Sequence, residues 1–203
     1  RNQSAIIAFK VSRKDYSGFH IAASHSDSPT LKIKESSEMN IENQYVKLNV
    51  EKYGGMLCAP WFDRPLSVAG RIIVKDGNRL TTKLINVDRD LLMIPNLAIH
   101  MNREVNDGYK YNIQKDMLPL YRMSNSGKAF KEMIAEEAGV SVDQIKGMDL
   151  FLYNRMEGTV WGCDGEFISA PRLDDLQCAF TSTMALLNSE SDRCIPVVAV
   201  FDN

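Results

Sequence analysis

The chain has 203 residues, of which 44% are hydrophobic, and its formal net charge is −2. This composition is typical of a globular protein, and the balanced charge argues against a protein that neutralises nucleic acid or lies on an acidic membrane. No apolar run approaches the roughly 18 residues of a membrane-spanning helix, and the chain starts without a basic-then-apolar secretory pattern. We therefore expect a soluble, cytoplasmic protein of one large domain or two small ones, with no nucleic-acid and no membrane partner.

The first forty residues predict β structure. Two β-rich runs, residues 4–11 and 19–24, flank a polar turn at residues 12–18 and predict a hairpin. Pro29 prevents continuation as a central strand. Polar residues follow the second run abruptly, and this is where open α/β sheets usually place ligands.

Residues 34–123 predict a mostly β unit, a small barrel or sandwich. Short runs with period-2 character recur, and the Asp-Gly-Asn sequence at residues 76–78 predicts a tight hairpin turn. A helix is predicted over residues 128–138, with Gly139 as its terminator, and a strand over residues 148–153.

The last part of the chain returns to an α/β pattern. A helix with one apolar face is predicted, and Asp174 and Asp175 lie at its start; that face comprises Leu173, Leu176, Phe180, Met184 and Leu187. Residues 194–201 (CIPVVAVF) predict a strand buried on both faces. The order α/β, β, α/β indicates a split α/β domain with an inserted β unit. The chain stops before such a sheet is complete, so we interpret it as a fragment.

Two patterns could form part of a metal site: a histidine followed by an aspartate, and a pair of adjacent aspartates. His25, at the predicted end of a strand, could bind a metal through one ring nitrogen while Asp27 accepts the other N–H. A loop histidine capped by its neighbour is the alternative. The Asp174–Asp175 pair suits divalent metals, because one carboxylate can bridge two ions, but a helix dipole also favours such a pair without metal. The residues alone favour a metal-assisted hydrolase that uses His25, Asp27 and Asp174.

The other candidates are weaker. His100 follows an apolar stretch and fits a core or loop position, and Glu166 is an acid or base candidate by position alone. The sequence WFDR at residues 61–64 fits a turn with a buried tryptophan and an Asp–Arg pair, or an aromatic platform. Four separated cysteines without a C-x-x-C pair indicate free thiols in a reducing compartment.

Six segments, taken in chain order, resemble the aspartyl aminopeptidase family, which includes the vacuolar leucine aminopeptidases. They are SHSDSP with LKIK (24–34), YGG (53–55), WFDRPLSVAGR (61–71), IPNLAIH (94–100), EFISAPRLDDL (166–176) and VFDN (200–203). This resemblance implies a metalloaminopeptidase that hydrolyses acidic or neutral N-terminal residues from peptides. It implies two divalent metal ions, with zinc favoured over manganese or cobalt.

The resemblance also implies an architecture. Residues 1–36 and 156–203 would be two parts of the catalytic α/β domain, and residues 37–155 an inserted, mostly β dimerisation domain. Dimers would assemble into a homo-oligomer, a tetrahedral dodecamer.

Residue roles follow from the same resemblance. His25 matches a metal ligand, Asp27 the catalytic-site carboxylate that orients this histidine, and Asp174 the carboxylate that bridges both ions. His100 matches a histidine that reaches substrate in a neighbouring subunit's active site. The family's Glu-Glu pair, a general base and a metal ligand, follows the segment that matches residues 201–203 and is absent here.

We therefore expect the 203-residue chain alone to be inactive. Two alternatives remain open from the sequence. One is a catalytically incomplete homologue that acts as an assembly or binding module, and the other is a metal hydrolase of different amides.

Overall fold

The computed structural model describes residues 4–11, 15–191 and 193–202. Part of the predicted polar turn at residues 12–18, and Asn203 of the last matching segment, lie outside the described residues. The chain has a mixed α/β fold and divides into two compact units. Unit 1 comprises Arg1–Ser28 and Gly158–Asn203, and unit 2 comprises Pro29–Glu157.

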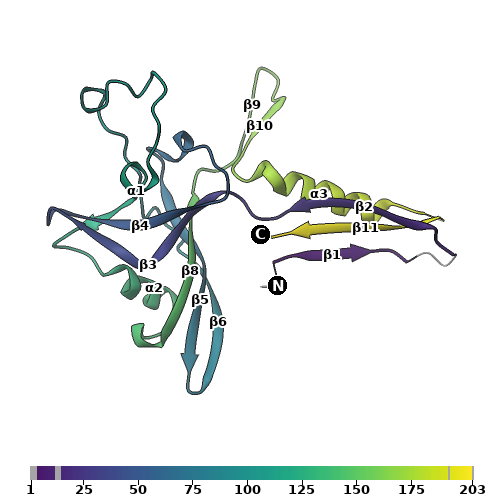
Figure 1. Cartoon of the computed structure of the whole chain (residues 1–203), viewed down its shortest axis with the longest axis horizontal. Coiled ribbons are helices and arrows are strands. Elements are labelled where there is room, and N and C mark those ends of the chain that lie inside the picture. Colours follow the sequence, from purple (N-terminus) through teal and green to yellow (C-terminus); the bar gives the residue numbers. More distant parts are fainter. Residues whose placement is uncertain (1–3, 12–14, 192, 203) are drawn as a thin grey trace. The chain divides into compact units, whose positions relative to one another are not determined.

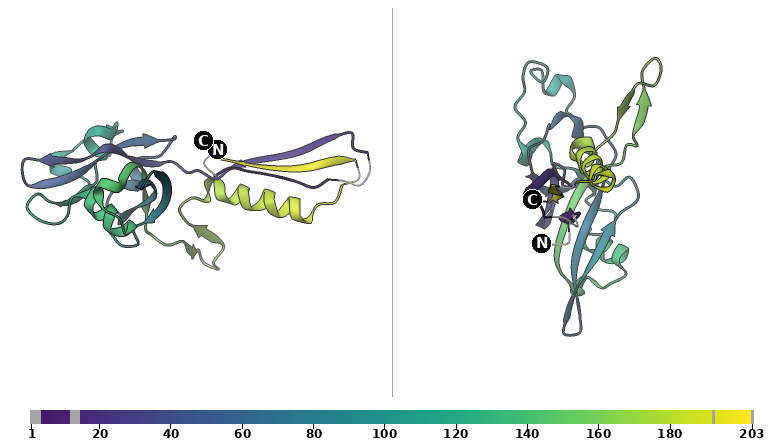
Figure 2. Two further views of the ribbon diagram at one scale, coloured as in Figure 1. Left: turned by 90° about the horizontal axis from the view of Figure 1, so that it is seen from below. Right: turned by 90° about the vertical axis from the view of Figure 1, so that its right-hand side faces the viewer.

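Unit 1 is built on a three-stranded sheet with a helix along one face (Figures 1 and 2). Its elements are β1 (Ile6–Phe9), β2 (Gly18–His25), β9 (Thr159–Trp161), β10 (Phe167–Ser169), α3 (Leu173–Asn188) and β11 (Cys194–Phe201). The strand order is β1-β11-β2, and β9 and β10 form a separate antiparallel hairpin. β11 runs antiparallel to β1 and parallel to β2.

The predicted hairpin between residues 4–11 and 19–24 is wrong. β1 and β2 are both present, but β11 lies between them and pairs with each. β11 is a continuous apolar run, so the central position buries it best. Val198, Ala199 and Val200 are buried and point alternately to the two faces of the sheet, as predicted for this strand.

Helix α3 is apolar on two sides. Ala179 and Leu186 pack against Val198 and Val200 of the sheet. The face that the sequence analysis identified lies elsewhere on the helix, and its residues are 39–65% exposed: Leu173, Leu176, Phe180, Met184 and Leu187. An exposed apolar side of this kind is typical of a surface that another protein segment covers. Within the described ranges, no helix has the length and hydropathy to cross a bilayer.

Unit 2 is built on a six-stranded antiparallel sheet with the order β6-β5-β8-β3-β4-β7 (Figure 1). The strands are β3 (Thr30–Ile41), β4 (Tyr45–Tyr53), β5 (Leu66–Asp76), β6 (Arg79–Asn86), β7 (Leu120–Met123) and β8 (Ile145–Asn154). The helices are α1 (Ile113–Asp116), α2 (Phe130–Ala138) and the 3-10 turns η1 (Ala59–Trp61), η2 (Ile99–Met101) and η3 (Val142–Gln144). The sheet carries most of the buried apolar side chains of the unit.

Local predictions in unit 2 are confirmed. The Asp-Gly-Asn turn joins β5 to β6, and Gly77 adopts a positive φ of 57°. Helix α2 places Phe130, Met133 and Ile134 in the core. It ends where Gly139 adopts a left-handed conformation, which releases the chain without a steric penalty.

Gly70 provides a test of the packing in unit 2. It lies in β5 between β6 and β8 with φ 151°, and a Cβ there would overlap the Asp149 carbonyl oxygen and come within 3.0 Å of Leu150 Cα. We expect Gly70→Ala to separate the central strands and to lower the free energy of unfolding by about 2–4 kcal/mol. Thermal or urea unfolding of the whole protein measures this.

Gly77→Ala is the matched control. Gly77 also has a positive φ, but its surroundings are open, so only the backbone cost of about 1 kcal/mol applies. Equal losses in the two variants would contradict the close approach of strands β5 and β8.

Candidate metal centre

Three chain segments meet at one edge of the unit 1 sheet. The parallel strands β2 and β11 end together, with His25 opposite Phe201, and the Ser26 N–H donates to the Phe201 carbonyl at 2.8 Å. Asp174 and Asp175 have non-helical backbone angles, so the regular part of α3 begins after them. Carboxyl ends of parallel strands are where α/β sheets usually bind ligands.

The His25 ring is held by its neighbour Asp27. Nδ1 lies 2.9 Å from the Asp27 backbone oxygen and 3.4 Å from its Oδ1. The hydrogen bond to this backbone oxygen raises the pKa of His25, and the carboxylates of Asp175, Asp27 and Asp174 add to the effect against the opposing influence of desolvation. When Nδ1–H donates to a carbonyl, the neutral ring presents an unprotonated Nε2 to the other side.

Two carboxylates lie on the Nε2 side of the ring. Nε2 is 3.4 Å from Asp174 Oδ1 and 3.7 Å from Asp175 Oδ2. The candidate ligand atoms of His25, Asp174 and Asp175 all lie within 4.8 Å of one another. One imidazole nitrogen with carboxylate oxygens is a donor set that suits zinc and other divalent transition metals. The residues present therefore fit a metal ion.

The two aspartates differ in environment. The Asp174 side chain is 93% exposed, whereas that of Asp175 is 15% exposed. Asp175 Oδ2 accepts the His25 backbone N–H at 3.1 Å. The Cys178 thiol also bonds this carboxylate; the hydrogen bonds from Cys178 and then His25 lower the pKa of Asp175, and the pKa of Cys178 is raised. The sequence analysis missed Cys178, although its position one helical turn after Asp175 is a usable signal.

The remaining candidates lie outside this cluster. His100 lies in η2 of unit 2 and its side chain is exposed. Glu166 belongs to the β9–β10 turn, where its Oε2 accepts the Asp164 N–H at 2.9 Å. Its own backbone N–H, followed by the N–H groups of Asp164 and Cys163, lowers the pKa of Glu166 against the opposing influence of desolvation, which makes it a turn-stabilising residue.

The segment at residues 61–64 differs from the prediction. Phe62, rather than Trp61, is the buried aromatic residue. Asp63 pairs with Asn96, accepting its backbone N–H at 2.9 Å and its side-chain N–H at 2.8 Å, while Arg64 contacts Met156. These hydrogen bonds from Asn96 lower the pKa of Asp63. Asp63 therefore fixes the start of the segment that carries His100.

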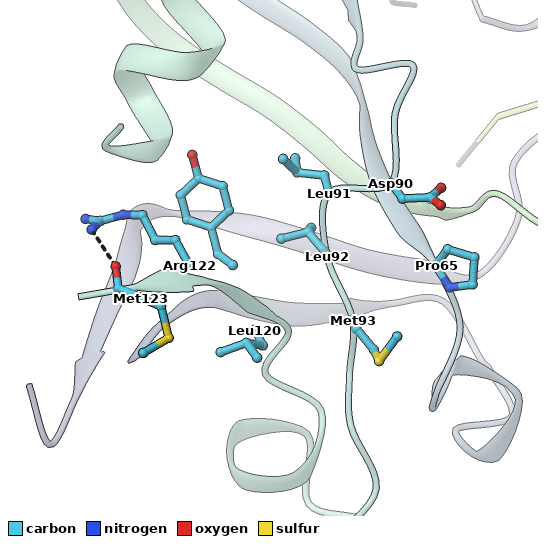
Figure 3. Close-up of a pocket in the computed structure, with 9 residues that line it drawn as sticks. Pro65, Asp90, Leu91, Leu92, Met93, Leu120, Arg122 and Met123 are labelled. Atoms are coloured by element: carbon cyan, nitrogen blue, oxygen red, sulfur yellow. Dashed lines mark hydrogen bonds between the residues drawn. The ribbon is translucent and has the colours of Figure 1, made fainter. Parts of the chain in front are cut away.

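A pocket of about 430 Å³ lies in unit 2 (Figure 3). It is lined by Pro65, Asp90, Leu91, Leu92, Met93, Leu120, Tyr121, Arg122 and Met123. Its two charged residues are already paired, because Asp90 accepts from Arg155 at 2.7 Å and Arg122 bonds Glu38 and the Met123 carbonyl. The pocket thus offers a mainly apolar surface, and the His25 cluster is the chemically reactive arrangement.

The comparisons with known proteins agree with one family. A family model described as aminopeptidase I zinc metalloprotease (M18) matches residues 1–203. A protein of Clostridium acetobutylicum named "Probable M18 family aminopeptidase 2" is 47% identical over 212 residues, which cover 100% of this chain and 49% of the relative. The protein of the same name from Pseudomonas aeruginosa (strain PAO1) is 37% identical, over 97% of this chain and 48% of its own length.

Solved structures share the fold. The mApe1 structure of Chaetomium thermophilum has a TM-score of 0.85 and 35% identity, over 100% of this chain and 50% of that one. The S. cerevisiae mApe1 dodecamer has a TM-score of 0.77 and 25% identity, over 100% of this chain and 48% of that one. The chain spans about half the length of the curated relatives that it matches.

The Asp63–Asn96 contact can be tested through backbone protection. We expect Asp63→Asn to raise amide hydrogen exchange over residues 95–102 by about tenfold at pH 7, because one of two charge-assisted hydrogen bonds is lost. The folded-state pKa of Asp63 is lowered, so the contribution of its carboxylate is present above the unfolded pKa and is lost as the pH falls through the folded value. The protection factors of the wild type and of Asp63→Asn should therefore differ at pH 7 and become equal near pH 3.

Asp107→Asn is a suitable control. Asp107 follows this segment in the chain and is exposed, and its carboxylate accepts no hydrogen bond from the part of the chain that the structure describes. Equal exchange in Asp63→Asn and Asp107→Asn at pH 7 would show that the contact does not order the segment.

Proposed function

Because the chain belongs to the M18 family of aminopeptidase I zinc metalloproteases, we propose that the whole protein is a metal-dependent aminopeptidase that removes N-terminal residues from peptides. The observation that carries this proposal is the cluster of His25, Asp174 and Asp175 at the carboxyl ends of parallel strands. A family match alone does not supply reactive geometry. Here a histidine and two aspartates, residue types that suit a divalent metal site, lie together although His25 and Asp175 are 150 residues apart in the chain.

The donor set suggests a role for each residue. His25 Nε2 and the exposed carboxylate of Asp174 would hold metal, and Asp27 would orient the His25 ring through its backbone oxygen and carboxylate. Bound zinc supplies a Lewis acid that polarises a scissile carbonyl and lowers the pKa of water. We propose two ions with Asp174 as the bridge, zinc being favoured over manganese or cobalt. The remaining ligands would come from the rest of the whole protein.

The assembly of the whole protein is also a proposal. We infer that unit 2 (Pro29–Glu157), which contains the predicted insertion at residues 37–155 and the whole of β3, serves as a dimerisation domain. The predicted parts of the catalytic domain at residues 1–36 and 156–203 would lie on either side of it in the chain. The similar S. cerevisiae mApe1 is a dodecamer, which supports the same assembly here. The exposed side chain of His100 is compatible with contact to substrate in a neighbouring subunit. Peptides with acidic or neutral N-terminal residues would be the substrates, and the cytoplasm the location.

The metal content and the peptidase activity of the whole protein test whether it is a metal-dependent aminopeptidase. We expect two divalent ions per subunit and chelator-sensitive hydrolysis of Asp-, Glu- or Leu-anilides. In His25→Ala and in Asp174→Ala the activity should fall by at least about 10³-fold together with the metal content, because a metal site that lacks one ligand no longer generates the nucleophile. Elemental analysis and anilide hydrolysis measure both quantities.

The alternatives give different outcomes in that experiment. A metal-free, inactive protein that still forms large assemblies would favour an assembly module. Hydrolysis of acylated amino acids in preference to aminoacyl-anilides would indicate a different amide hydrolase. Retained stoichiometric zinc in both variants would contradict the ligand assignment.

His100 has a separate expected phenotype. We expect His100→Ala in the whole protein to leave the metal content unchanged and to lower turnover by about 10²-fold, because a substrate hydrogen bond is lost and no ligand is removed. His20→Ala is the matched control, since His20 is also an exposed histidine and lies in β2. Loss of an ion from His100→Ala would make this residue a ligand instead.

A further inference from the structure

We propose that Asp175 is a positioning residue that fixes His25, and that it is not itself a metal ligand. This inference rests on the proposed function, in which the cluster binds metal. The candidate ligand atoms of His25, Asp174 and Asp175 all lie within 4.8 Å of one another, so membership of the cluster alone does not distinguish the two carboxylates. The two carboxylates differ in their hydrogen bonds and in their exposure to solvent.

The Asp175 carboxylate is already engaged within the chain. Its Oδ2 accepts the His25 N–H at 3.1 Å, and the carboxylate also bonds the Cys178 thiol. The neighbouring Asp174 carboxylate is almost fully exposed and accepts no hydrogen bond from the described residues. Asp174 Oδ1 is also closer to His25 Nε2, at 3.4 Å against 3.7 Å for Asp175 Oδ2. A metal ion can therefore recruit Asp174 without disrupting the structure, whereas recruiting Asp175 would compete with two existing bonds.

The bond from His25 to Asp175 meets a specific need of the sheet. In the three-stranded sheet, β2 is an edge strand, and the Ser26 N–H points toward β11. Successive N–H groups of a strand point in opposite directions, so the His25 N–H points away from β11 and toward Asp175. The side chain of Asp175 thus accepts the outward-pointing N–H of the last residue of β2.

Two contacts then fix His25. Asp175 holds the backbone at His25 to the start of α3, and the Asp27 backbone oxygen holds the ring through Nδ1. Cys178 lies one turn further along α3, and its thiol interacts with the Asp175 carboxylate. Together these contacts direct His25 Nε2 toward the Asp174 carboxylate, which is the arrangement that metal binding needs. Partners that orient a ligand in this way typically contribute 10- to 100-fold to metal affinity.

The chemistry of the two roles differs in one testable respect. A hydrogen-bond acceptor survives replacement of aspartate by asparagine, because the amide retains a carbonyl oxygen of the same position. A metal ligand loses its function on the same replacement, because the neutral amide binds zinc far more weakly than a carboxylate does. Asp175→Asn, Asp175→Ala and Asp174→Asn in the whole protein therefore form a discriminating set.

We expect Asp175→Asn to bind zinc within about threefold of the wild-type affinity in a competition assay with a chromogenic chelator. Asp175→Ala should bind about 10- to 100-fold more weakly but reach the same stoichiometry at saturation. Asp174→Asn should lose stoichiometric zinc. A loss in Asp175→Asn as large as that in Asp174→Asn, or wild-type affinity in Asp175→Ala, would overturn the proposal.

A metal-free readout separates this inference from the proposed function. In the apo protein, the His25 amide should exchange with solvent at least about tenfold faster in Asp175→Ala than in the wild type, and at nearly the wild-type rate in Asp175→Asn. Unchanged protection in Asp175→Ala would refute the positioning role even if zinc binds. If the wild-type protein binds no zinc, the proposed function fails, and this exchange measurement still decides whether Asp175 holds His25. If Asp175→Ala does not fold, Asp175→Asn decides through its zinc affinity.

Discussion

The parallel pairing of β2 with β11 is the constraint on which unit 1 depends. Two adjacent parallel strands cannot be joined by a tight turn, so the chain between His25 and Cys194 must cross over and return. The last part of that crossover is α3, which packs on the sheet and begins at the edge where both strands end. Asp174 and Asp175 therefore arrive beside His25 because of the topology of the sheet, and the local sequence at each site only supplies the donor groups.

The sequence predicts this structure well wherever the determining interactions are local. The β5–β6 turn depends on Gly77, and the end of α2 depends on Gly139, so both can be recognised within a few residues. The prediction of a β1–β2 hairpin failed because β11, the strand that lies between them, comes about 170 residues later in the chain. Likewise, His25 and Asp174 were identifiable as donors, but only a resemblance to a family could bring them together. That the Asp27 backbone oxygen lies closer to His25 than the Asp27 carboxylate depends on a side-chain rotamer, which no sequence pattern specifies.

Unit 1 exposes many large apolar side chains. On the sheet face opposite α3, residues from β1 and β2 flank the small side chains of β11, and the exposed apolar ones include Ile7, Phe9 and Ile21. The outer side of α3 adds Phe180 and Leu187. Contiguous apolar surface of this kind is typical of regions that other protein segments cover. This agrees with a chain that spans about half the length of its curated relatives.

The pairing of β3 with β8 determines where unit 2 begins and ends. These are its first and last strands, Lys32 lies opposite Phe151, and Thr30 donates to the Leu152 carbonyl at 2.6 Å. His25 and Asp175 of the metal centre are 150 residues apart in the chain. Bringing two such residues together in a flexible chain costs roughly 4 kcal/mol of entropy. Once unit 2 has folded, its two ends are neighbours and most of that cost has already been met. We therefore expect the kinetics of folding to be ordered, with unit 2 formed during synthesis and the metal centre assembled last, after Asp174 and β11 have left the ribosome.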